Sequence, residues 1–174
     1  AADRLAPPGT LDIARIEAGR IDLAPEPVDV ARVLDEALTL VRPGADARGV
    51  QLQVAPGITQ VVEADPQRLR QVLVNLLSNA IKFNRPQGRV EVAAHVVADG
   101  VRIEVRDDGP GIPPERRARL FVPFERLGAE RSAVEGTGLG LALSKRLVEA
   151  MDGTIGVDDV ATGGACAWLV LPAA

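Results

Sequence analysis

Apolar residues recur at helical spacing along several stretches of the chain. In residues 66–84 they form one broad stripe at about 100° per residue, made of Leu69, Val72, Leu73, Leu76, Leu77, Ala80 and Phe83. Asp65 followed by Pro66 predicts where this helix begins, because an Asp side chain caps free N–H groups and proline fits the first turn. Residues 30–41 and 138–151 have the same periodicity, and shorter helices are predicted over residues 10–19 and 113–121.

Strands are predicted between these helices. Residues 50–54 and 101–107 alternate between apolar and polar side chains, and residues 60–64, 89–97 and 165–172 are the other expected strands. Asp99-Gly100 separates two of them and predicts a β-hairpin turn. Because helices and hairpins are mixed, we expect an α+β fold: a two-layer α/β sandwich with a mixed, mostly antiparallel sheet.

Composition narrows the class of protein. The chain has 174 residues, of which 47% are hydrophobic, so it can form one domain with a sizeable core. Its net charge of −4 gives no basic surface for nucleic acid. The single cysteine, Cys166, cannot form an internal disulfide, so we expect a reducing, cytoplasmic environment. No apolar run reaches ~18 residues, so we expect no direct membrane contact. The chain begins with Ala, and we expect a fragment of a longer protein.

A second stripe on the helix over residues 66–84 is polar. Asn75, Asn79 and Lys82 fall within about 60° of one another, at the edge of the apolar face. They are either solvated residues flanking a core helix or ligands. An amide oxygen suits Mg²⁺ that is already bound to phosphates, and Lys82 would add a cation for the same phosphates.

The segment "VRDDGPGI" ends a strand in a carboxylate and two glycines. Alternation with Val101, Ile103 and Val105 places Asp107 on the inward face. A buried carboxylate is costly unless it is hydrogen-bonded, and Gly109 and Gly111 allow the backbone to approach a flat ligand. The segment is either a plain tight turn or a site where Asp107 accepts a hydrogen bond from an exocyclic amine, which would favour adenine over guanine.

The segment "EGTGLGLALSK" places glycines at alternate positions directly before a predicted helix. Backbone N–H groups at a helix N-terminus bind anions such as phosphate. The segment lacks the G-x-x-x-x-G-K-[ST] pattern, and Leu141 stands where a dinucleotide fingerprint has its third glycine. A plain loop is the alternative. The glycines indicate a phosphate-binding segment only when they are taken as the last part of an ordered set of motifs.

That ordered set is "NLLSNAIKF", "DDGPGI", "LFVPF" and "GTGLGLALSKRLVEAMDG". It resembles the ATP-binding catalytic domain of sensor histidine kinases, a member of the ATPase superfamily shared with gyrase, mismatch-repair proteins and a heat-shock chaperone. "LDIARIEAGRIDLAPEPVDV" resembles the junction that precedes this domain. The resemblance implies a remnant of the second dimerisation helix and junction in residues 1–25 and the ATP-binding domain in residues 26–174. It also implies a Bergerat-type fold, with about three helices covering one face of the sheet.

The resemblance implies ATP and Mg²⁺ as cofactors and assigns roles to residues. Asn79 would bind Mg²⁺ with help from Asn75, and Asn75, Lys82 and Arg126 would be the catalytic residues. Phe83 and Ile112 would flank the base, and Phe121 and Phe124 would anchor a lid that ends at Gly136. The residues implied in cofactor binding are Asn79, Lys82, Phe83, Asp107, Gly109, Gly111, Ile112, Phe124, Gly136, Thr137, Gly138, Leu139 and Gly140.

The resemblance also implies partners. His95 is the only histidine and lies in a predicted strand, so the phosphoacceptor would lie on a dimerisation domain outside this chain. The phosphoryl group would then pass to the receiver domain of a response regulator. We expect this fragment to be monomeric and the longer parent protein to be a homodimer. Whether the parent protein is anchored in a membrane is left open. The alternatives are a non-catalytic nucleotide-gated scaffold, or a chaperone- or mismatch-repair-type ATPase, which would need a general-base Glu that residues 66–84 lack.

Overall fold

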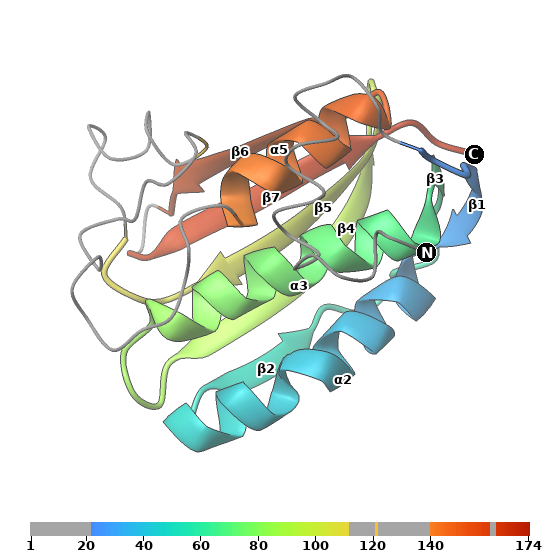
Figure 1. The fold of residues 1–174 in the computed structure, drawn as a ribbon. Helices are drawn as coiled ribbons and strands as arrows, with labels where there is room; N and C mark the ends of the chain where they lie inside the picture. The colour runs from blue at the N-terminus through green and yellow to red at the C-terminus, as the bar shows by residue number, and fades with distance from the viewer. Residues whose placement is uncertain (1–21, 112–120, 122–139, 161–162) are drawn as a thin grey trace, which may run out of the picture.

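A five-stranded sheet forms one layer of the molecule (Figure 1). The computed structural model describes residues 22–111, 121, 140–160 and 163–174. The strand order is β2-β4-β5-β7-β6, and the strands are β2 (Gln51–Val54), β4 (Arg89–Val97), β5 (Gly100–Asp107), β6 (Thr154–Asp159) and β7 (Ala165–Leu171). Only β2 and β4 pair in parallel; the other neighbours are antiparallel.

The second layer consists of helices α2 (Val30–Arg48), α3 (Pro66–Lys82) and α5 (Gly140–Ala150). All three lie on the same face of the sheet, with α3 between the other two and in contact with both (Figure 1). The predicted α+β sandwich with a mostly antiparallel sheet is therefore confirmed. None of the described helices has the length and apolar character needed to cross a bilayer.

The core lies between the two layers and follows the predicted periodicities. The predicted inward residues Val101, Ile103 and Val105 are buried, as are Leu169 and Leu171 on the neighbouring β7. On α3 the expected apolar stripe is buried, except that Ile81 joins it and Phe83 is half-buried just after the helix ends. Burial of these side chains away from water is the main favourable term in forming the sandwich.

A small second sheet lies at one end of the sandwich (Figure 1). It pairs β1 (Glu26–Asp29) with β3 (Val61–Ala64) in antiparallel register. Asp65 follows β3 and caps α3, as predicted: its Oδ1 accepts hydrogen bonds from the N–H groups of Gln67 at 3.0 Å and Arg68 at 3.2 Å. Its Oδ2 accepts a third from Ala24 at 2.9 Å. One carboxylate thus starts the helix and holds the segment before β1.

The hairpin turn lies one residue earlier than predicted. Ala98 and Asp99 form the turn, and Gly100 is already the first residue of β5, at a φ of 143°. A side chain at Gly100 would collide with the backbone carbonyl of Leu171. The glycine is therefore needed both for the backbone conformation at the start of β5 and for the close packing of β5 against the end of β7.

Several predicted elements lie outside the described residues. These are the short helices over residues 10–19 and 113–121, apart from Phe121, and the first two residues of the helix predicted to begin at Gly138. His95 is exposed in β4, as expected of an ordinary strand residue.

The sheet face opposite the helices carries a buried ionic cluster. Glu104 is only 4% exposed, and its carboxylate accepts hydrogen bonds from Arg102 at 2.7 Å and Arg106 at 3.2 Å. Arg102 also lies 4.7 Å from the ring centroid of Trp168, a cation–π distance. Cys166 is buried on this same outer face. Burial opposes ionisation of Glu104, but the hydrogen bond from Arg102 and the charges of Arg106 and Arg102 outweigh it and lower its pKa.

We predict that Asp65→Ala lowers the free energy of unfolding by about 1–2 kcal/mol, because it removes the cap of a buried helix start. Asp29→Ala is the matched control, since Asp29 caps α2 through one exposed hydrogen bond from Ala31. Urea unfolding of both variants gives the comparison. An equal loss in the two variants would contradict the role of Asp65 in joining α3 to the segment before β1.

We predict that Glu104→Gln lowers the free energy of unfolding by roughly 1–3 kcal/mol at neutral pH, because it weakens two charged hydrogen bonds. The folded-state pKa of Glu104 is depressed, so its ionisation adds stability above the unfolded pKa and loses it as pH falls through the folded pKa. The gap between wild type and variant should therefore shrink in acid. Urea unfolding at several pH values measures it, and a gap independent of pH would contradict the account.

Candidate functional site

Helix α3 carries the predicted polar stripe along one edge. Asn75, Asn79 and Lys82 are all half-buried, between the fully buried face of α3 and solvent. The helix ends at Lys82, where Phe83 is the C-cap and its N–H bonds the carbonyl of Asn79 at 3.0 Å. The stripe therefore lies at the rim of a core helix, a position that fits both solvated flanking residues and ligands.

Asn75 joins α3 to the first turn of α5. Its Nδ2 donates to the carbonyl of Gly140 and to the hydroxyl of Ser144, each at 3.2 Å. Gly140 is the first residue of α5 and the last glycine of the glycine-rich segment. The structure thus brings the first polar residue of the stripe against the described end of that segment.

Asn79 differs from Asn75. No hydrogen bond joins its side-chain amide to any residue in the part of the chain that the structure describes. The described residues also include no cluster of three or more His, Cys, Asp and Glu that could hold a metal ion. A divalent cation at this edge would depend on amide oxygens and on oxygens of its own ligand.

Asp107 ends β5 on the helix-facing side, as predicted, and is half-buried. Its Oδ1 accepts hydrogen bonds from the N–H groups of Gly109 at 3.0 Å and Ala165 at 3.4 Å. Among the described residues no donor bonds Oδ2, so that oxygen can accept from a ligand. Burial raises the pKa of Asp107, and the charge of Asp108 adds to the rise, against the two backbone hydrogen bonds.

Glycines allow the chain around Asp107 to pack closely. A side chain at Gly164 would collide with the carbonyl of Asp107, and Gly164 has a φ of 89°. Gly111 has a φ of 79°, and a Cβ there would lie 3.2 Å from the carbonyl of Gly164. The turn after β5 therefore rests on the backbone just before β7. Gly164 was not identified from the sequence, where its only signal is the pair Gly163-Gly164 before a strand.

Asn84 connects the end of α3 to this turn. It is 5% exposed; its Nδ2 donates to the carbonyl of Arg89 at 3.1 Å and its Oδ1 accepts from the N–H of Arg85 at 2.8 Å. A Cβ on Gly109 would lie 3.1 Å from Asn84 Oδ1 and the same distance from Asp107 Oδ1. Sequence reasoning missed Asn84, because its position after the polar stripe gives no sign of a buried partner.

The described site therefore has two parts held by one helix. The middle of α3 meets the start of α5 through Asn75, and the end of α3 meets the turn after β5 through Asn84. Phe121 is described, with Lys145 Nζ 6.0 Å from its ring centroid. The remaining predicted residues lie outside the described part of the chain: Ile112, Phe124, Arg126, Gly136, Thr137, Gly138 and Leu139.

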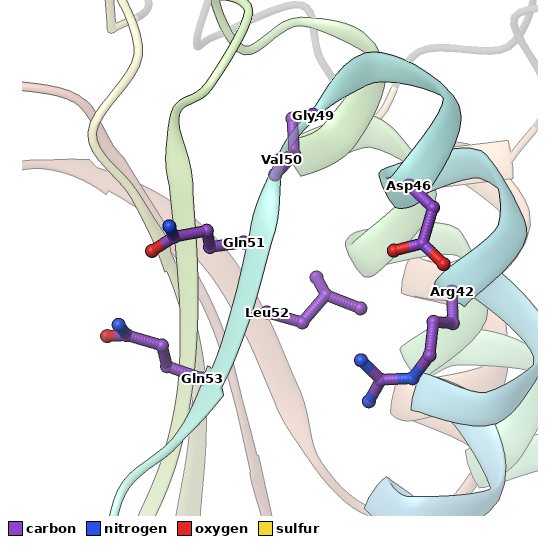
Figure 2. A pocket seen from close by; sticks show the side chains of 7 residues that line it. All are labelled: Arg42, Asp46, Gly49, Val50, Gln51, Leu52 and Gln53. Atoms are coloured by element: carbon purple, nitrogen blue, oxygen red, sulfur yellow. The ribbon is translucent and has the colours of Figure 1, made fainter.

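A groove lies apart from these motifs, between the C-terminal half of α2 and strand β2 (Figure 2). Its volume is about 470 Å³, and Arg42, Asp46 and Gln53 are among its lining residues. Leu52 points from β2 toward α2, whereas the Gln51 and Gln53 side chains point away from it (Figure 2). The sheet order places β2 at the edge, separated from β5 by β4, so this groove is not part of the site around Asp107.

Curated relatives match nearly the whole chain. The sensor protein KdpD of Rathayibacter rathayi is 42% identical over 164 residues, which are 94% of this chain and 19% of that protein. The circadian input-output histidine kinase CikA of Synechococcus elongatus is 38% identical over 166 residues, 93% of this chain and 22% of that protein. The chain thus spans about a fifth of the length of these relatives.

Solved structures agree in fold and in family. Full-length ShkA in complex with AMPPNP has a TM-score of 0.81 and 37% identity, over 95% of this chain and 35% of that chain. The mycobacterial sensor histidine kinase MprB has a TM-score of 0.75 and 34% identity, over 86% of this chain and 98% of that chain. Residues 64–174 match the family described as histidine kinase-, DNA gyrase B-, and HSP90-like ATPase. The chain therefore belongs to this ATPase family, and its homologues are sensor histidine kinases.

Proposed function

We propose that this chain is the ATP-binding catalytic module of a two-component sensor histidine kinase. It transfers the γ-phosphoryl group of Mg-ATP to a histidine on a dimerisation domain, for relay to an aspartate on a response-regulator receiver domain. The observation that carries the proposal is the placement of α3. One helix presents an amide-bearing edge, contacts the glycine-bearing start of α5, and ends against the turn that carries a half-buried carboxylate.

The carboxylate end of the site suits an adenine base. Asp107 keeps Oδ2 free of described donors while Oδ1 is held by two backbone N–H groups, so the carboxylate is oriented before a ligand arrives. Adenine offers an exocyclic amine to such an acceptor. Guanine has an oxygen there instead and would leave two acceptors facing each other.

The amide end of the site suits the phosphates. The Asn79 amide oxygen is a hard neutral ligand, which fits a Mg²⁺ ion that keeps phosphate oxygens and waters in its shell. Mg²⁺ bound there would neutralise charge on the β- and γ-phosphates. Lys82, three residues further along α3, supplies a cation on the same edge, and Asn75 lies one turn earlier beside Gly140.

We propose that the phosphoacceptor histidine and the receiver domain lie outside the residues of this chain. The only histidine, His95, is exposed on β4, whereas the site lies on the helical layer around α3. The nucleophile would therefore come from a separate domain, and the module would supply positioning and charge neutralisation. We propose a homodimeric, cytoplasmic arrangement of the catalytic and dimerisation domains in the parent protein.

A hydrolytic ATPase of the wider superfamily is less well supported. Activating water would require a general base beside the phosphates, and α3 contains no Glu. One turn before Asn79 the chain has Asn75, whose amide cannot take a proton from water. A nucleotide-gated scaffold without catalysis would bind nucleotide but would not transfer a phosphoryl group. Mixing the chain with a histidine-bearing acceptor domain and Mg-ATP therefore distinguishes a scaffold from a kinase.

We predict that the chain, mixed with Mg-ATP and the histidine-bearing dimerisation domain of its parent protein, phosphorylates that domain on histidine. Asn79→Ala should lower this transfer by at least 10-fold, because the metal loses a ligand, and should leave adenosine affinity within about twofold. Radiolabel transfer and calorimetry provide the two readouts. Binding without transfer by the wild type would favour the scaffold, and equal loss of adenosine and Mg-ATP binding in the variant would mean that Asn79 maintains the fold.

We predict that Asp107→Ala weakens adenosine binding about 10- to 150-fold, the equivalent of losing a charged hydrogen bond worth about 1.5–3 kcal/mol. The preference for ATP over GTP should narrow as well. Because burial raises the pKa of Asp107, protonation should weaken binding as pH falls through that raised pKa, and Asp107→Asn should lack this step. Calorimetry across pH tests both effects, and an unchanged base preference in Asp107→Ala would place selectivity elsewhere.

A further inference from the structure

Ser144 is a polar residue buried to 0% exposure in α5, one turn after Gly140. A hydroxyl group removed from water in this way needs a hydrogen-bond partner. Its partner is on another helix, where Asn75 Nδ2 donates to Ser144 Oγ at 3.2 Å. The two residues are 69 positions apart in the chain, and neither the motifs nor the comparisons assign Ser144 a role.

The same amide makes a second bond that determines its orientation. Asn75 Nδ2 also donates to the carbonyl of Gly140 at 3.2 Å, and a carbonyl can only accept. The nitrogen side of the amide must therefore face α5, where its two hydrogens have two acceptors. Among the described residues no donor bonds Asn75 Oδ1. A rotated amide would place its oxygen against the Gly140 carbonyl and lose that bond, keeping at most a bond in which the Ser144 hydroxyl donates.

This orientation matters because of where Asn75 lies. It is one turn before Asn79 on the same edge of α3, and its amide atoms lie 3.7–3.8 Å from the position of a Cβ on Gly140. The helices already pack through buried apolar residues, including Leu76 and Leu77 on α3 and Leu143 and Leu147 on α5. A polar pair is not required to hold them together, since apolar side chains would bury the same surface without the desolvation cost of polar groups.

We propose that Ser144 is a positioning residue for the phosphate end of the nucleotide. Its hydroxyl, with the carbonyl of Gly140, holds the Asn75 amide in one orientation and leaves Oδ1 to the bound metal and phosphates. This inference rests on the proposed function and adds a residue to it. Supporting residues that fix the orientation of a ligand side chain are a general requirement of precise sites.

The test is Ser144→Ala in the 174-residue chain, with calorimetry of Mg-ADP and of adenosine. Losing one hydrogen bond should weaken Mg-ADP about 3- to 10-fold and change adenosine affinity less than about twofold, because the base end is untouched. Ser78→Ala, which removes a half-buried hydroxyl from α3, is the matched control and should bind both ligands as wild type does. If Ser144 only maintained the fold, Ser144→Ala would weaken the binding of Mg-ADP and of adenosine equally, and this result would overturn the proposal.

A double-mutant cycle with Asn75→Ala tests the mechanism. If Ser144 acts through Asn75, adding Ser144→Ala to Asn75→Ala should change Mg-ADP affinity by less than about twofold. If the two substitutions instead weaken Mg-ADP binding by factors that multiply, the inference is overturned. It is also overturned if Ser144→Ala binds Mg-ADP as tightly as the wild type. In either case, phosphotransfer by the wild type would leave the proposed function intact. Failure of the wild type to bind Mg-ADP at all would overturn both.

Discussion

Helix α3 is buried between α2, α5 and the sheet, and this burial determines where the residues of the site lie. The apolar face of the helix determines its rotation about its own axis, because Leu69, Leu73 and Leu76 must all be removed from water. Once that rotation is set, Asn75, Asn79 and Lys82 can only lie at the edge. The position of the polar stripe is thus a consequence of the core and needs no separate device.

The ends and neighbours of α3 then place the other parts of the site. Asp65 starts the helix in a defined register, and Asn84 after its last turn packs against the turn that follows β5. That turn carries Asp107, whose burial is compensated by backbone N–H groups from Gly109 and Ala165. A half-buried carboxylate with one oxygen held and the other left for a ligand is costly in a fold without a function for it. The energetic cost of this half-buried Asp107 carboxylate therefore supports the proposal that Asp107 is part of a binding site.

The sequence predicted what depends on local pattern. Periodicity gave α3 and its buried stripe, alternation placed Asp107 on the inward face, and Asp65-Pro66 gave the helix start. The bonds from Asn75 to Gly140 and Ser144 could not be predicted, because they join residues far apart in the chain and depend on how α3 and α5 cross. The same holds for Glu104: alternation places it on the outer face of the sheet, where a solvated side chain is expected, and only the strand register brings Arg102 and Arg106 around it.

Backbone packing explains the remaining differences. Gly100 belongs to β5 rather than to the hairpin turn, and it packs closely against the end of β7, a contact that no local turn rule contains. Gly164 has a similar role against Asp107. The roles of all the predicted site residues toward a nucleotide remain predictions, both for those that the structure describes, such as Asn75, Asn79 and Asp107, and for the motif residues that lie outside the described part of the chain.

The proposed function requires that nucleotide binds along α3, between the turn after β5 and the start of α5. Titration of the isotope-labelled chain with Mg-ADP, followed by amide resonances in NMR spectra, tests it most directly. We expect shifts at Asn79, Asp107, Gly109 and Gly140, and unchanged resonances at Arg42 and Gln53 in the groove between α2 and β2. Shifts confined to that groove, or no shifts at millimolar nucleotide in a folded sample, would contradict it.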